Sequence, residues 1–452
     1  MQTISAPFQF KGGVHPSYHK ELSSGSPIRP LPLPALLTVP MSMHLGAPAK
    51  PIVKVGDEVK AGQVIAEAGG FISAPVHAPA AGKVKAIAQT LTAPGRPCQA
   101  VILETSADQG EWELLPPLPN WRETPPEQII AQIGAAGIVG MGGAGFPTKV
   151  KLSPPTDKPI DTVILNGAEC EPYLTSDHRM MVEHADGIRT GAEIIRYVLH
   201  ADKLRFAIED NKPDAIAALE KACEGIEGDV AIIRLPTSYP QGSEKQQIYA
   251  VTGREVPRGG LPMDAGCVVE NVSTAFAIYD AVVNGRPLTQ RVIAVTGDAV
   301  ANPANLLAPF GTSYQTLIDA CGGFKAPATK VISGGPMMGF AVSTTDMPNG
   351  KTTSGLLALT ARSVVGFTSQ ACISCGRCVD ACPMRLIPSE LSQCIEADDI
   401  DGALQVNLMD CIECGSCAWA CPAHRPLVQH IRRGKAVIMA RRLAERAKAA
   451  QK

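Results

Sequence analysis

The feature that most constrains this chain is a cysteine run that occurs twice near its C-terminal end. The runs are Cys372-x2-Cys375-x2-Cys378-x3-Cys382-Pro383 and Cys411-x2-Cys414-x2-Cys417-x3-Cys421-Pro422. A spacing of two residues lets one tight loop place three thiolates around three irons of a cubane, while the fourth thiolate points away. The doubled run therefore predicts two [4Fe–4S] clusters in a helical domain over residues 366–430.

Because the fourth cysteine of each run points away from its own loop, we expect the runs to exchange ligands. One cluster is assigned to Cys372, Cys375, Cys378 and Cys421, and the other to Cys411, Cys414, Cys417 and Cys382. Structural zinc is the alternative, since it also uses Cys-x2-Cys pairs. Zinc, however, gives no reason for the doubled run. Two adjacent clusters would carry single electrons, which requires both a donor and an acceptor.

Composition limits the compartment and the class of partner. Nine of the 14 cysteines lie between Cys372 and Cys421, in a chain whose first residues have no basic and apolar leader. This pattern predicts metal binding in a reducing cytoplasm, with no signal peptide. No apolar run approaches the roughly 20 residues of a membrane span, so we expect a soluble or peripheral protein. The net charge of −2 gives no support for nucleic-acid binding.

Residues 36–106 predict short strands joined by turns. Residues 53–65 and 78–87 alternate apolar and polar positions around glycines. This pseudo-repeat resembles the flattened barrel-sandwich of lipoyl and biotinyl carrier domains. Those carriers need a lysine on the exposed hairpin between the halves, and residues 61–82 contain none. We therefore expect a docking or structural module, with His77 on its surface or packed within it.

A glycine-rich segment follows a predicted helix that contains Ile129, Ile130 and Ile133. Gly140, Gly142, Gly143 and Gly145 fit the pattern G-x-G-x-x-G. An ordinary dinucleotide fingerprint follows a strand and opens a helix, and this segment does not. Four glycines in six residues still indicate that backbone closely approaches a flat or anionic group.

Downstream, strands over 162–165, 204–208 and 230–235 alternate with helices, the first of which runs to about His200. This order predicts a parallel sheet covered by helices, in a Rossmann-like α/β domain. Asn166, Glu169 and Glu171 follow the first strand, at the edge where such sheets bind ligands. Asn211, after the second strand, is expected to cap a helix or to bind ribose.

These segments carry a family resemblance. Residues 140–151 and 166–172 resemble the FMN- and NADH-binding flavoprotein subunit of respiratory complex I, and residues 239–244 and 270–274 continue the match. With the barrel module in front and the cysteine runs behind, nearly the whole chain resembles the C subunits of Rnf-type electron-transport complexes. The resemblance implies four domains: an N-terminal segment with a barrel-sandwich module (1–106), an FMN/NADH α/β domain (127–285), a β-grasp, SLBB-like domain (286–345) and a bacterial-ferredoxin-type two-cluster domain (366–430). Residues 107–126 and 346–365 would be linkers, and residues 431–452 would form a basic helix.

The resemblance also implies roles for individual residues. Non-covalent FMN would lie against Gly140, Gly142, Gly143 and Gly145, with Lys151, Asn166, Tyr239 and Glu244 around the flavin and Asn271 and Thr274 near its phosphate. Phe146, Glu169 and Glu171 would face NADH. Lys151, Glu169 and Glu171 are the candidate catalytic residues, and Lys151 would stabilise negative charge on reduced flavin.

The function implied is that of an NADH-dependent oxidoreductase within a translocase complex. Electrons would pass from NADH through FMN and two [4Fe–4S] clusters to membrane and iron–sulfur partner subunits, and so indirectly to ferredoxin. The chain would lie peripherally on the cytoplasmic face of the bacterial inner membrane, with ion pumping left to the membrane subunits. Two alternatives are a cobalamin reductase of related architecture and a non-enzymatic ferredoxin-like relay. The N-terminal position of the barrel argues against the first, and the glycine segment argues against the second.

The last segment, residues 431–452, carries eight Lys or Arg residues and one acidic residue, Glu445. Ile431, Ile438 and Leu443 recur at helical spacing. This tail could rest on anionic lipid or on an acidic partner, or it could be a solvated helix.

Overall fold

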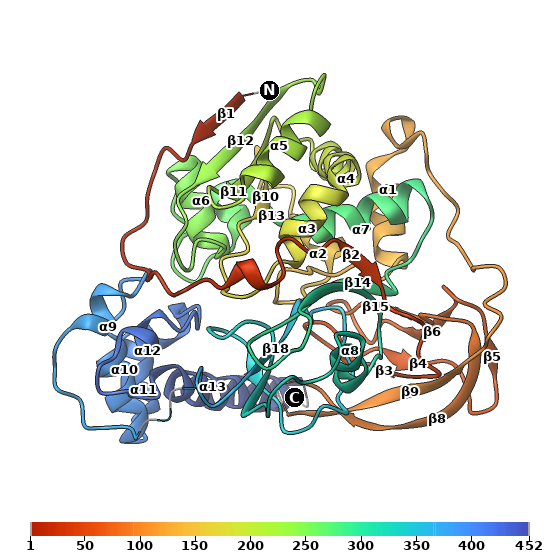
Figure 1. Ribbon diagram of the computed structural model, residues 1–452. Helices are drawn as coiled ribbons and strands as arrows, with labels where there is room; N and C mark the ends of the chain where they lie inside the picture. Colours follow the sequence, from red (N-terminus) through yellow and green to blue (C-terminus); the bar gives the residue numbers. More distant parts are fainter. Residues whose placement is uncertain (1, 94, 365, 367, 451–452) are drawn as a thin grey trace.

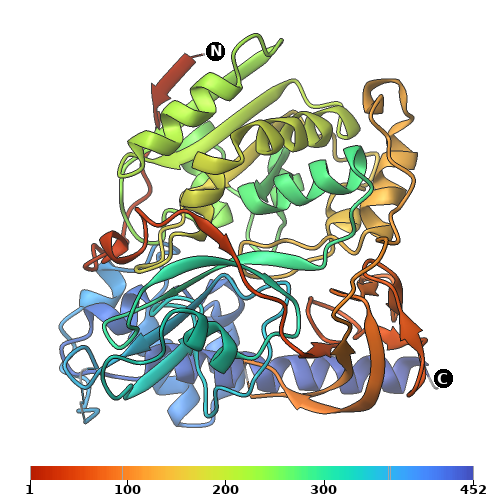
Figure 2. The ribbon, with the colours of Figure 1, turned by 45° about the vertical axis from the view of Figure 1, so that its right-hand side comes forward.

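The computed structural model describes residues 2–93, 95–364, 366 and 368–450. Figure 1 shows an α/β domain above a row of three smaller units. These are a helical unit on the left, a mixed sheet in the centre and an antiparallel barrel on the right. The same two-tier arrangement is seen after the rotation in Figure 2. The multidomain α/β and α+β architecture expected from the sequence is confirmed.

The upper domain is built on a five-stranded parallel sheet in the order β1-β12-β11-β10-β13. Its strands are β1 (Gln2–Ser5), β10 (Thr162–Gly167), β11 (Lys203–Glu209), β12 (Asp229–Leu235) and β13 (Cys267–Asn271). Val163, Ile164 and Leu165 of β10 are fully buried, as expected for a strand covered on both faces. The edge strand β1 comes from the N-terminal segment and pairs with β12.

Helices cover both faces of this sheet. They are α1 (Pro126–Ala135), α2 (Thr148–Lys151), α3 (Ser176–Glu183), α4 (Ala185–Val198), α5 (Pro213–Ala222), α6 (Glu244–Thr252) and α7 (Val272–Val283). The single helix expected up to His200 is broken at His184, whose backbone leaves the helical region at φ −128° and ψ 29°. Gly191 of α4 lies so close to α7 that a Cβ there would stand 1.8 Å from the Ala275 carbonyl oxygen. The break thus lets α4 take its own direction against α7. Asn211 does not cap α5, whose N-cap residue is Lys212.

The barrel module has two facing antiparallel sheets, β3-β9-β8-β5 and β4-β6-β7. Its strands are β3 (Leu36–Pro40), β4 (Lys50–Pro51), β5 (Glu58–Val59), β6 (Val64–Glu67), β7 (Val76–His77), β8 (Gly82–Leu91) and β9 (Pro97–Thr105). Residues 107–126, expected as a linker, lie against the body of the protein. Trp121 in the turn η2 (Trp121–Glu123) is buried, and its ring meets Tyr197 of α4 edge-on.

The central unit is a six-stranded mixed sheet in the order β17-β16-β18-β14-β15-β2. Its elements are β2 (Ile28–Pro30), β14 (Gln290–Thr296), β15 (Ala304–Pro309), α8 (Tyr314–Ala320), β16 (Lys330–Ser333), β17 (Phe340–Ala341) and β18 (Gly355–Leu359). Strand β18 lies within residues 346–365, which the sequence indicated as a linker, yet it pairs with both β14 and β16. Strand β2 comes from the N-terminal segment and pairs with β15. The β-grasp sheet therefore extends beyond 286–345 in both directions along the chain.

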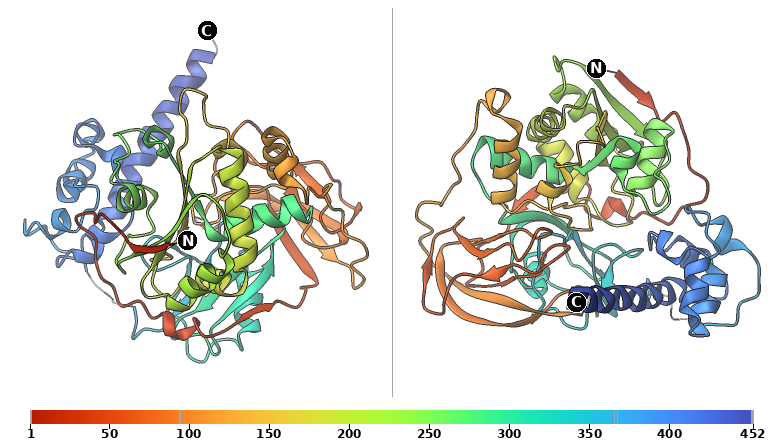
Figure 3. Two further views of the ribbon diagram at one scale, coloured as in Figure 1. Left: turned by 90° about the horizontal axis from the view of Figure 1, so that it is seen from above. Right: turned by 180° about the vertical axis from the view of Figure 1, so that it is seen from behind.

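The C-terminal unit consists of α9 (Arg377–Asp380), α10 (Pro388–Glu396), α11 (Ile400–Gln405), α12 (Ser416–Ala420) and α13 (Leu427–Ala450). Short 3-10 turns elsewhere are η1 (Lys20–Leu22), η3 (Pro262–Ala265) and η4 (Leu408–Asp410). Ile431 and Ile438 of α13 are buried against α10 and η4, whereas Leu443 is exposed. Viewed from behind, α13 runs from this unit toward the barrel (Figure 3). No helix in the described part of the chain is long and apolar enough to cross a membrane.

Candidate cofactor sites

The glycine segment forms a closed loop between α1 and α2. The Gly140 N–H donates to the Phe146 carbonyl at 2.9 Å, and Val139 bridges Pro147. Gly142, Gly143 and Ala144 are exposed between buried neighbours. Gly143 has φ +139°, and a Cβ there would meet no described atom within 4 Å. The loop therefore offers bare backbone on an open face, as close approach to a flat or anionic ligand requires.

The N-terminus of α7 adjoins this loop. The Asn271 side chain accepts hydrogen bonds from the N–H groups of Ser273 (2.9 Å) and Thr274 (3.3 Å). Thr274 Oγ1 accepts from Met141 N–H at 2.9 Å, and a Cβ on Gly142 would lie 3.1 Å from that of Asn271. Loop and helix end are thus held together. The positive end of a helix dipole favours an anion, so these residues fit the phosphate of FMN.

Lys151 supplies a fixed positive charge on the same side. Its Nζ donates to Glu244 Oε1 at 2.9 Å and to the Val269 carbonyl, and Glu270 Oε1 is 3.9 Å away. Burial alone would lower the pKa of Lys151, but the carboxylates of Glu270 and Glu244 raise it above its usual value. Burial raises the pKa of Glu270. Lys151 therefore stays protonated at physiological pH.

Glu270 was not singled out from the sequence. The signal for it was an acidic residue directly after the apolar residues Cys267, Val268 and Val269 of strand β13.

Asn166 closes the end of strand β10. Its Nδ2 donates to the Gly242 carbonyl at 2.9 Å, and its Oδ1 accepts from Ala168 N–H at 3.2 Å and from Gln247 Nε2 at 2.7 Å. These bonds join the strand to the segment that precedes α6. Asn166 is thereby fixed at the carboxyl edge of the sheet, where ligands bind in such folds.

Glu169 and Glu171 lie on the same loop, but their carboxylates contact neighbouring elements. Glu169 accepts from the N–H groups of Asp177 (2.8 Å) and His178 (3.1 Å) at the start of α3. Glu171 accepts from the N–H groups of Met337 (3.1 Å) and Met338 (2.8 Å) in the central unit. Burial raises the pKa of Glu171 to about 7. Their assignment to NADH stays a prediction.

Three charged residues around the site were not predicted from the sequence: Arg291 is buried, and Lys20 and Asp177 are half-buried. Lys20 donates to the carbonyls of Glu169 (2.7 Å), Glu171 (3.1 Å) and Leu174 (2.7 Å), which shapes this loop from the N-terminal segment. Asp177 accepts from Asn271 Nδ2 at 2.6 Å, and burial together with Glu169 raises its pKa to about 6. Arg291 of β14 donates to the Met141 carbonyl at 3.2 Å. Lone charged residues far apart in sequence gave no signal for these contacts.

Tyr239 connects the α/β domain to the second cysteine run. It is fully buried, and its hydroxyl donates to the Cys414 carbonyl at 2.6 Å. Gly415 has φ +85°, and a Cβ there would lie 2.8 Å from the Met337 carbonyl oxygen. The loop of Cys411–Cys417 is therefore seated directly on the α/β domain and the central unit.

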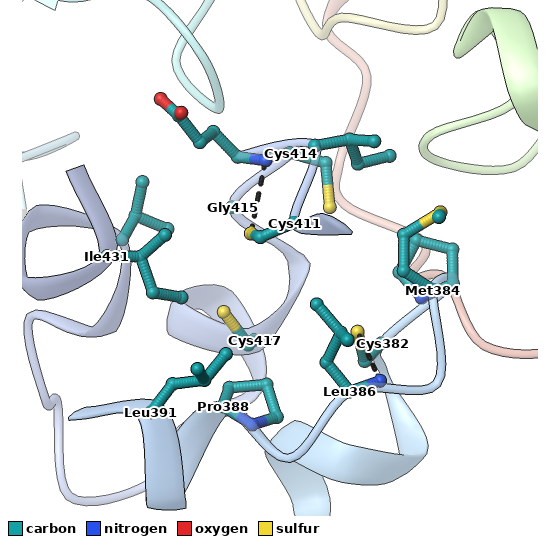
Figure 4. Close-up of a pocket in the computed structure, with 14 residues that line it drawn as sticks. Cys382, Met384, Leu386, Pro388, Leu391, Cys411, Cys414, Gly415, Cys417 and Ile431 are labelled. Carbon is teal, nitrogen blue, oxygen red and sulfur yellow. Dashed lines mark hydrogen bonds between the residues drawn. The ribbon is translucent and has the colours of Figure 1, made fainter. Parts of the chain in front are cut away.

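Four thiols line one cavity of the C-terminal unit. Figure 4 shows Cys382, Cys411, Cys414 and Cys417 around this space, with Leu391 and Ile431 on its apolar wall. Cys411 Sγ accepts from Glu413 N–H at 3.3 Å, and Cys382 Sγ accepts from Leu386 N–H at 3.4 Å. The structure thus brings together the set of thiols assigned to one cluster, including the one from the other run. N–H···S bonds and an apolar shell suit a [4Fe–4S] cluster.

The other predicted cluster set is only partly gathered. Cys378 is buried and packs with Cys421, whereas Cys372 and Cys375 are exposed on the preceding loop. Among the described residues, no three His, Cys, Asp or Glu side chains converge closely enough to hold one metal ion. In a cubane each thiolate binds a different iron, so ligands arranged around a wider space fit a cluster.

Comparison with known proteins assigns a family to each unit. Family models match the RnfC barrel sandwich hybrid domain at residues 8–108 and the Nuo51 FMN-binding domain at 133–280. They also match the SLBB domain at 292–341 and the 4Fe-4S dicluster domain at 365–422. The FMN and dicluster matches agree with the residues present, so the cofactors are FMN and two [4Fe–4S] clusters, and the zinc alternative is not supported.

Relatives match over nearly the whole chain. The C subunit of the proton-translocating ferredoxin:NAD(+) oxidoreductase complex of Clostridium ljungdahlii is 50% identical over 94% of this chain and 92% of that protein. The C subunit of the Na(+)-translocating complex of Acetobacterium woodii is 46% identical over 96% and 98%. The C subunit of the ion-translocating oxidoreductase complex of Rhodobacter capsulatus is 44% identical over 96% and 84%.

Among solved structures, a chain of the NAD+-reducing [NiFe]-hydrogenase in its air-oxidized state matches with a TM-score of 0.51 at 18% identity. The match covers 72% of this chain and 69% of that one, and it supports the fold alone. The full-length relatives support the function class, that of an oxidoreductase complex working with NAD(H). The chain belongs to the family of C subunits of Rnf-type ion-translocating ferredoxin:NAD(+) oxidoreductase complexes.

Proposed function

We propose that this chain is the NADH-oxidising subunit of its complex, which receives hydride at FMN and delivers single electrons toward partner subunits. The observation that carries the proposal is the continuity of the two sites. The open glycine loop and Lys151 occupy one domain, and Tyr239 of that domain donates directly to the Cys414 backbone. FMN, when bound, supplies the conversion between two-electron hydride chemistry and single-electron chemistry.

The chain's own residues bind, orient and stabilise. Asn271 and Thr274, at the start of α7, lie beside the phosphate, where the positive end of the helix favours an anion. Gly140, Gly142, Gly143 and Gly145 admit the ring system, bordered by Asn166, Tyr239 and Glu244. Lys151, kept protonated by Glu244 and Glu270, provides positive charge where negative charge develops on reduction.

For the dinucleotide, we propose Phe146, Glu169 and Glu171 as the residues nearest to NADH. Phe146 is half-buried next to the open glycine backbone, and its aromatic ring is of the kind that stacks on a base. The carboxylates of Glu169 and Glu171 already accept backbone hydrogen bonds, so they would act by holding the loop around NADH in place.

The metal sites follow the ligand exchange described above. We propose Cys382, Cys411, Cys414 and Cys417 for one cluster, and Cys372, Cys375, Cys378 and Cys421 for the other. The names of the relatives support assembly with the remaining subunits of a ferredoxin:NAD(+) oxidoreductase complex. We place the chain peripherally on the cytoplasmic face of the membrane, with ion translocation in the membrane subunits and ferredoxin reached through the complex.

The test is anaerobic purification with reconstituted iron, followed by measurement of bound FMN and of NADH-dependent reduction of an artificial acceptor. We expect about one FMN per chain and rapid NADH oxidation. Both should be lost in Gly142→Val, whose side chain would collide with Asn271. NADH oxidation should be lost in Lys151→Ala and retained in Lys149→Ala, an exposed lysine of the same helix. About eight irons with no flavin and no NADH activity in folded protein would leave a simple electron relay instead.

A further inference from the structure

The barrel module resembles a carrier domain, yet it lacks the carrier lysine and is packed against the flavin domain. We propose that its hairpin forms an outer wall of the NADH site, with Leu45 and Phe71 in contact with the adenine end of the dinucleotide. This inference rests on the proposed function and adds residues from a second domain to that site.

A buried lysine fixes the barrel module in place. Lys351, from the segment before β18, is fully buried and donates to the Pro75 carbonyl (2.9 Å) and to the Gly137 carbonyl (2.6 Å). Pro75 belongs to the barrel hairpin, and Gly137 follows α1. His77 is buried beside the same amine, and a Cβ on Gly137 would lie 3.3 Å from His77 Nδ1. One lysine therefore joins three units directly beneath the glycine loop, which opposes swinging of the hairpin.

The barrel module also contacts the glycine loop. Leu45 N–H donates to the Gly145 carbonyl at 2.9 Å, and a Cβ on Gly145 would lie 3.2 Å from His44 Cα. Ala47 N–H donates to the Ile72 carbonyl at 3.0 Å. Residues 43–47 thus lie between the hairpin tip, residues 69–74, and the loop that is proposed to hold FMN.

This contact leaves an apolar surface exposed to solvent. Leu45 is 51% exposed, Phe71 is 84% exposed and Ile72 is 39% exposed. Gly142–Ala144 are exposed on the adjoining loop, and Phe146 is half-buried there. Leu45 and Ile72 lie on adjoining segments, so that with Phe71 they form an exposed apolar edge rather than scattered single residues, and an apolar surface of this kind marks a binding site.

The chemistry of this edge selects the adenine base. Leu45, Phe71 and Ile72 carry no charge, so they do not favour a phosphate. A flat apolar base gains from an aromatic face. The nicotinamide must meet the flavin, which leaves the adenine end of NADH for the apolar edge next to Phe146. The hairpin tip that presents a prosthetic group in carrier domains would here receive part of a substrate.

The test compares ligands with and without the adenine end. Anaerobic, FMN-loaded protein is titrated with ADP-ribose and with nicotinamide mononucleotide, and binding is measured by calorimetry. We expect Phe71→Ala to weaken ADP-ribose binding about tenfold, the size of one base–aromatic stack, and Leu45→Ala to weaken it by a smaller factor. Nicotinamide mononucleotide should bind equally well to all variants. Val55→Ala is the matched control, because Val55 is 63% exposed in the turn before β5 of the same module.

The outcomes separate this inference from the proposed function. If wild-type protein binds neither ligand, the proposed function fails. If wild-type protein binds ADP-ribose and Phe71→Ala binds it equally well, the wall is refuted while the proposed function stands. The proposed contact would also be refuted if Val55→Ala weakened ADP-ribose binding as much as Phe71→Ala does, or if Phe71→Ala lost both ligands equally. Either result points to a general change in the module.

Discussion

Replacing Lys351 by methionine tests how a buried amine joins the barrel module to the rest of the protein. Burial lowers the pKa of Lys351 from 10.5 to about 7 in the folded chain. A neutral amine still has two N–H groups, which match the two carbonyls that it contacts, Pro75 and Gly137. The folded state therefore prefers the neutral form. His77, the titratable neighbour, has a pKa lowered to about 3 by burial and by Lys351, so it stays neutral above pH 6.

The direction in which stability changes with pH follows from proton binding. Between pH 7 and pH 10.5 the unfolded chain holds a proton on this amine that the folded chain does not, so stability rises with pH in that window. Each pKa unit corresponds to about 1.4 kcal/mol, which gives a penalty of about 5 kcal/mol well below pH 7. Raising the pH from 7 to 9 should relieve about 2 kcal/mol of it. In Lys351→Met this contribution is absent at every pH.

The assay is urea unfolding of anaerobic protein at pH 7, 8 and 9, followed by tryptophan fluorescence, to which buried Trp121 contributes. We expect the free energy of unfolding of wild-type protein to rise relative to that of Lys351→Met by about 2 kcal/mol between pH 7 and 9. Other titrating groups are common to both proteins and cancel in the difference. Lys60→Met, at an exposed lysine of the barrel module, should follow wild type. Parallel pH dependences of wild type and Lys351→Met would refute the reasoning.

Three further perturbations probe the contacts between units. Tyr239→Phe removes the hydrogen bond to the Cys414 carbonyl. The substitution should lower the free energy of unfolding by about 1 kcal/mol. It should also slow NADH-driven reduction of the clusters, measured by stopped-flow absorbance, with FMN content unchanged. Gly415→Ala forces a Cβ to 2.8 Å from the Met337 carbonyl oxygen at a backbone φ of +85°. The iron content should fall from about eight to about four atoms per chain, while FMN is retained. Glu171→Gln replaces one of two accepting oxygens with an amide donor that faces the N–H groups of Met337 and Met338. The free energy of unfolding should fall by about 1–3 kcal/mol, which lowers the midpoint of thermal unfolding. An unchanged midpoint would show that this contact contributes no stability.

Much of the fold was predictable because its determinants are local. The cysteine spacing fixes which loops can surround a cubane, and the apolar runs of β10, β11 and β12 alternate with helices in an order that admits only a parallel sheet. Helix α1 was expected from its isoleucines and begins with proline at its first turn, as sequence rules allow. The glycine loop could be recognised because four glycines in six residues leave bare backbone whatever their tertiary surroundings.

The remaining features depend on partners that are distant in the chain. β18 was missed because Gly355–Leu359 is a short apolar run whose pairing with β14 and β16 is decided only in the folded protein. Lys20, Lys351 and Arg291 were missed because a lone cation in a sequence is normally solvated. Lys351 and Arg291 are buried and Lys20 is half-buried here, because backbone carbonyls from other units satisfy their donors. Tertiary hydrogen bonding of this kind leaves no pattern in the sequence.

The N-terminal segment sets the timing of assembly. β1 waits for β12, and Ile28 of β2 pairs with Asn305 of β15, so 277 positions separate these partners along the chain. At about 5–20 residues per second on the ribosome, β2 stays unpaired for roughly 15–55 s after it is made. An unpaired strand is an opportunity for association with other chains. Prolines at positions 7, 16, 27, 30, 32 and 34 keep this segment a poor template during that interval. The residues that leave the ribosome first should therefore reach their native pairing only after β12 and β15 have been made.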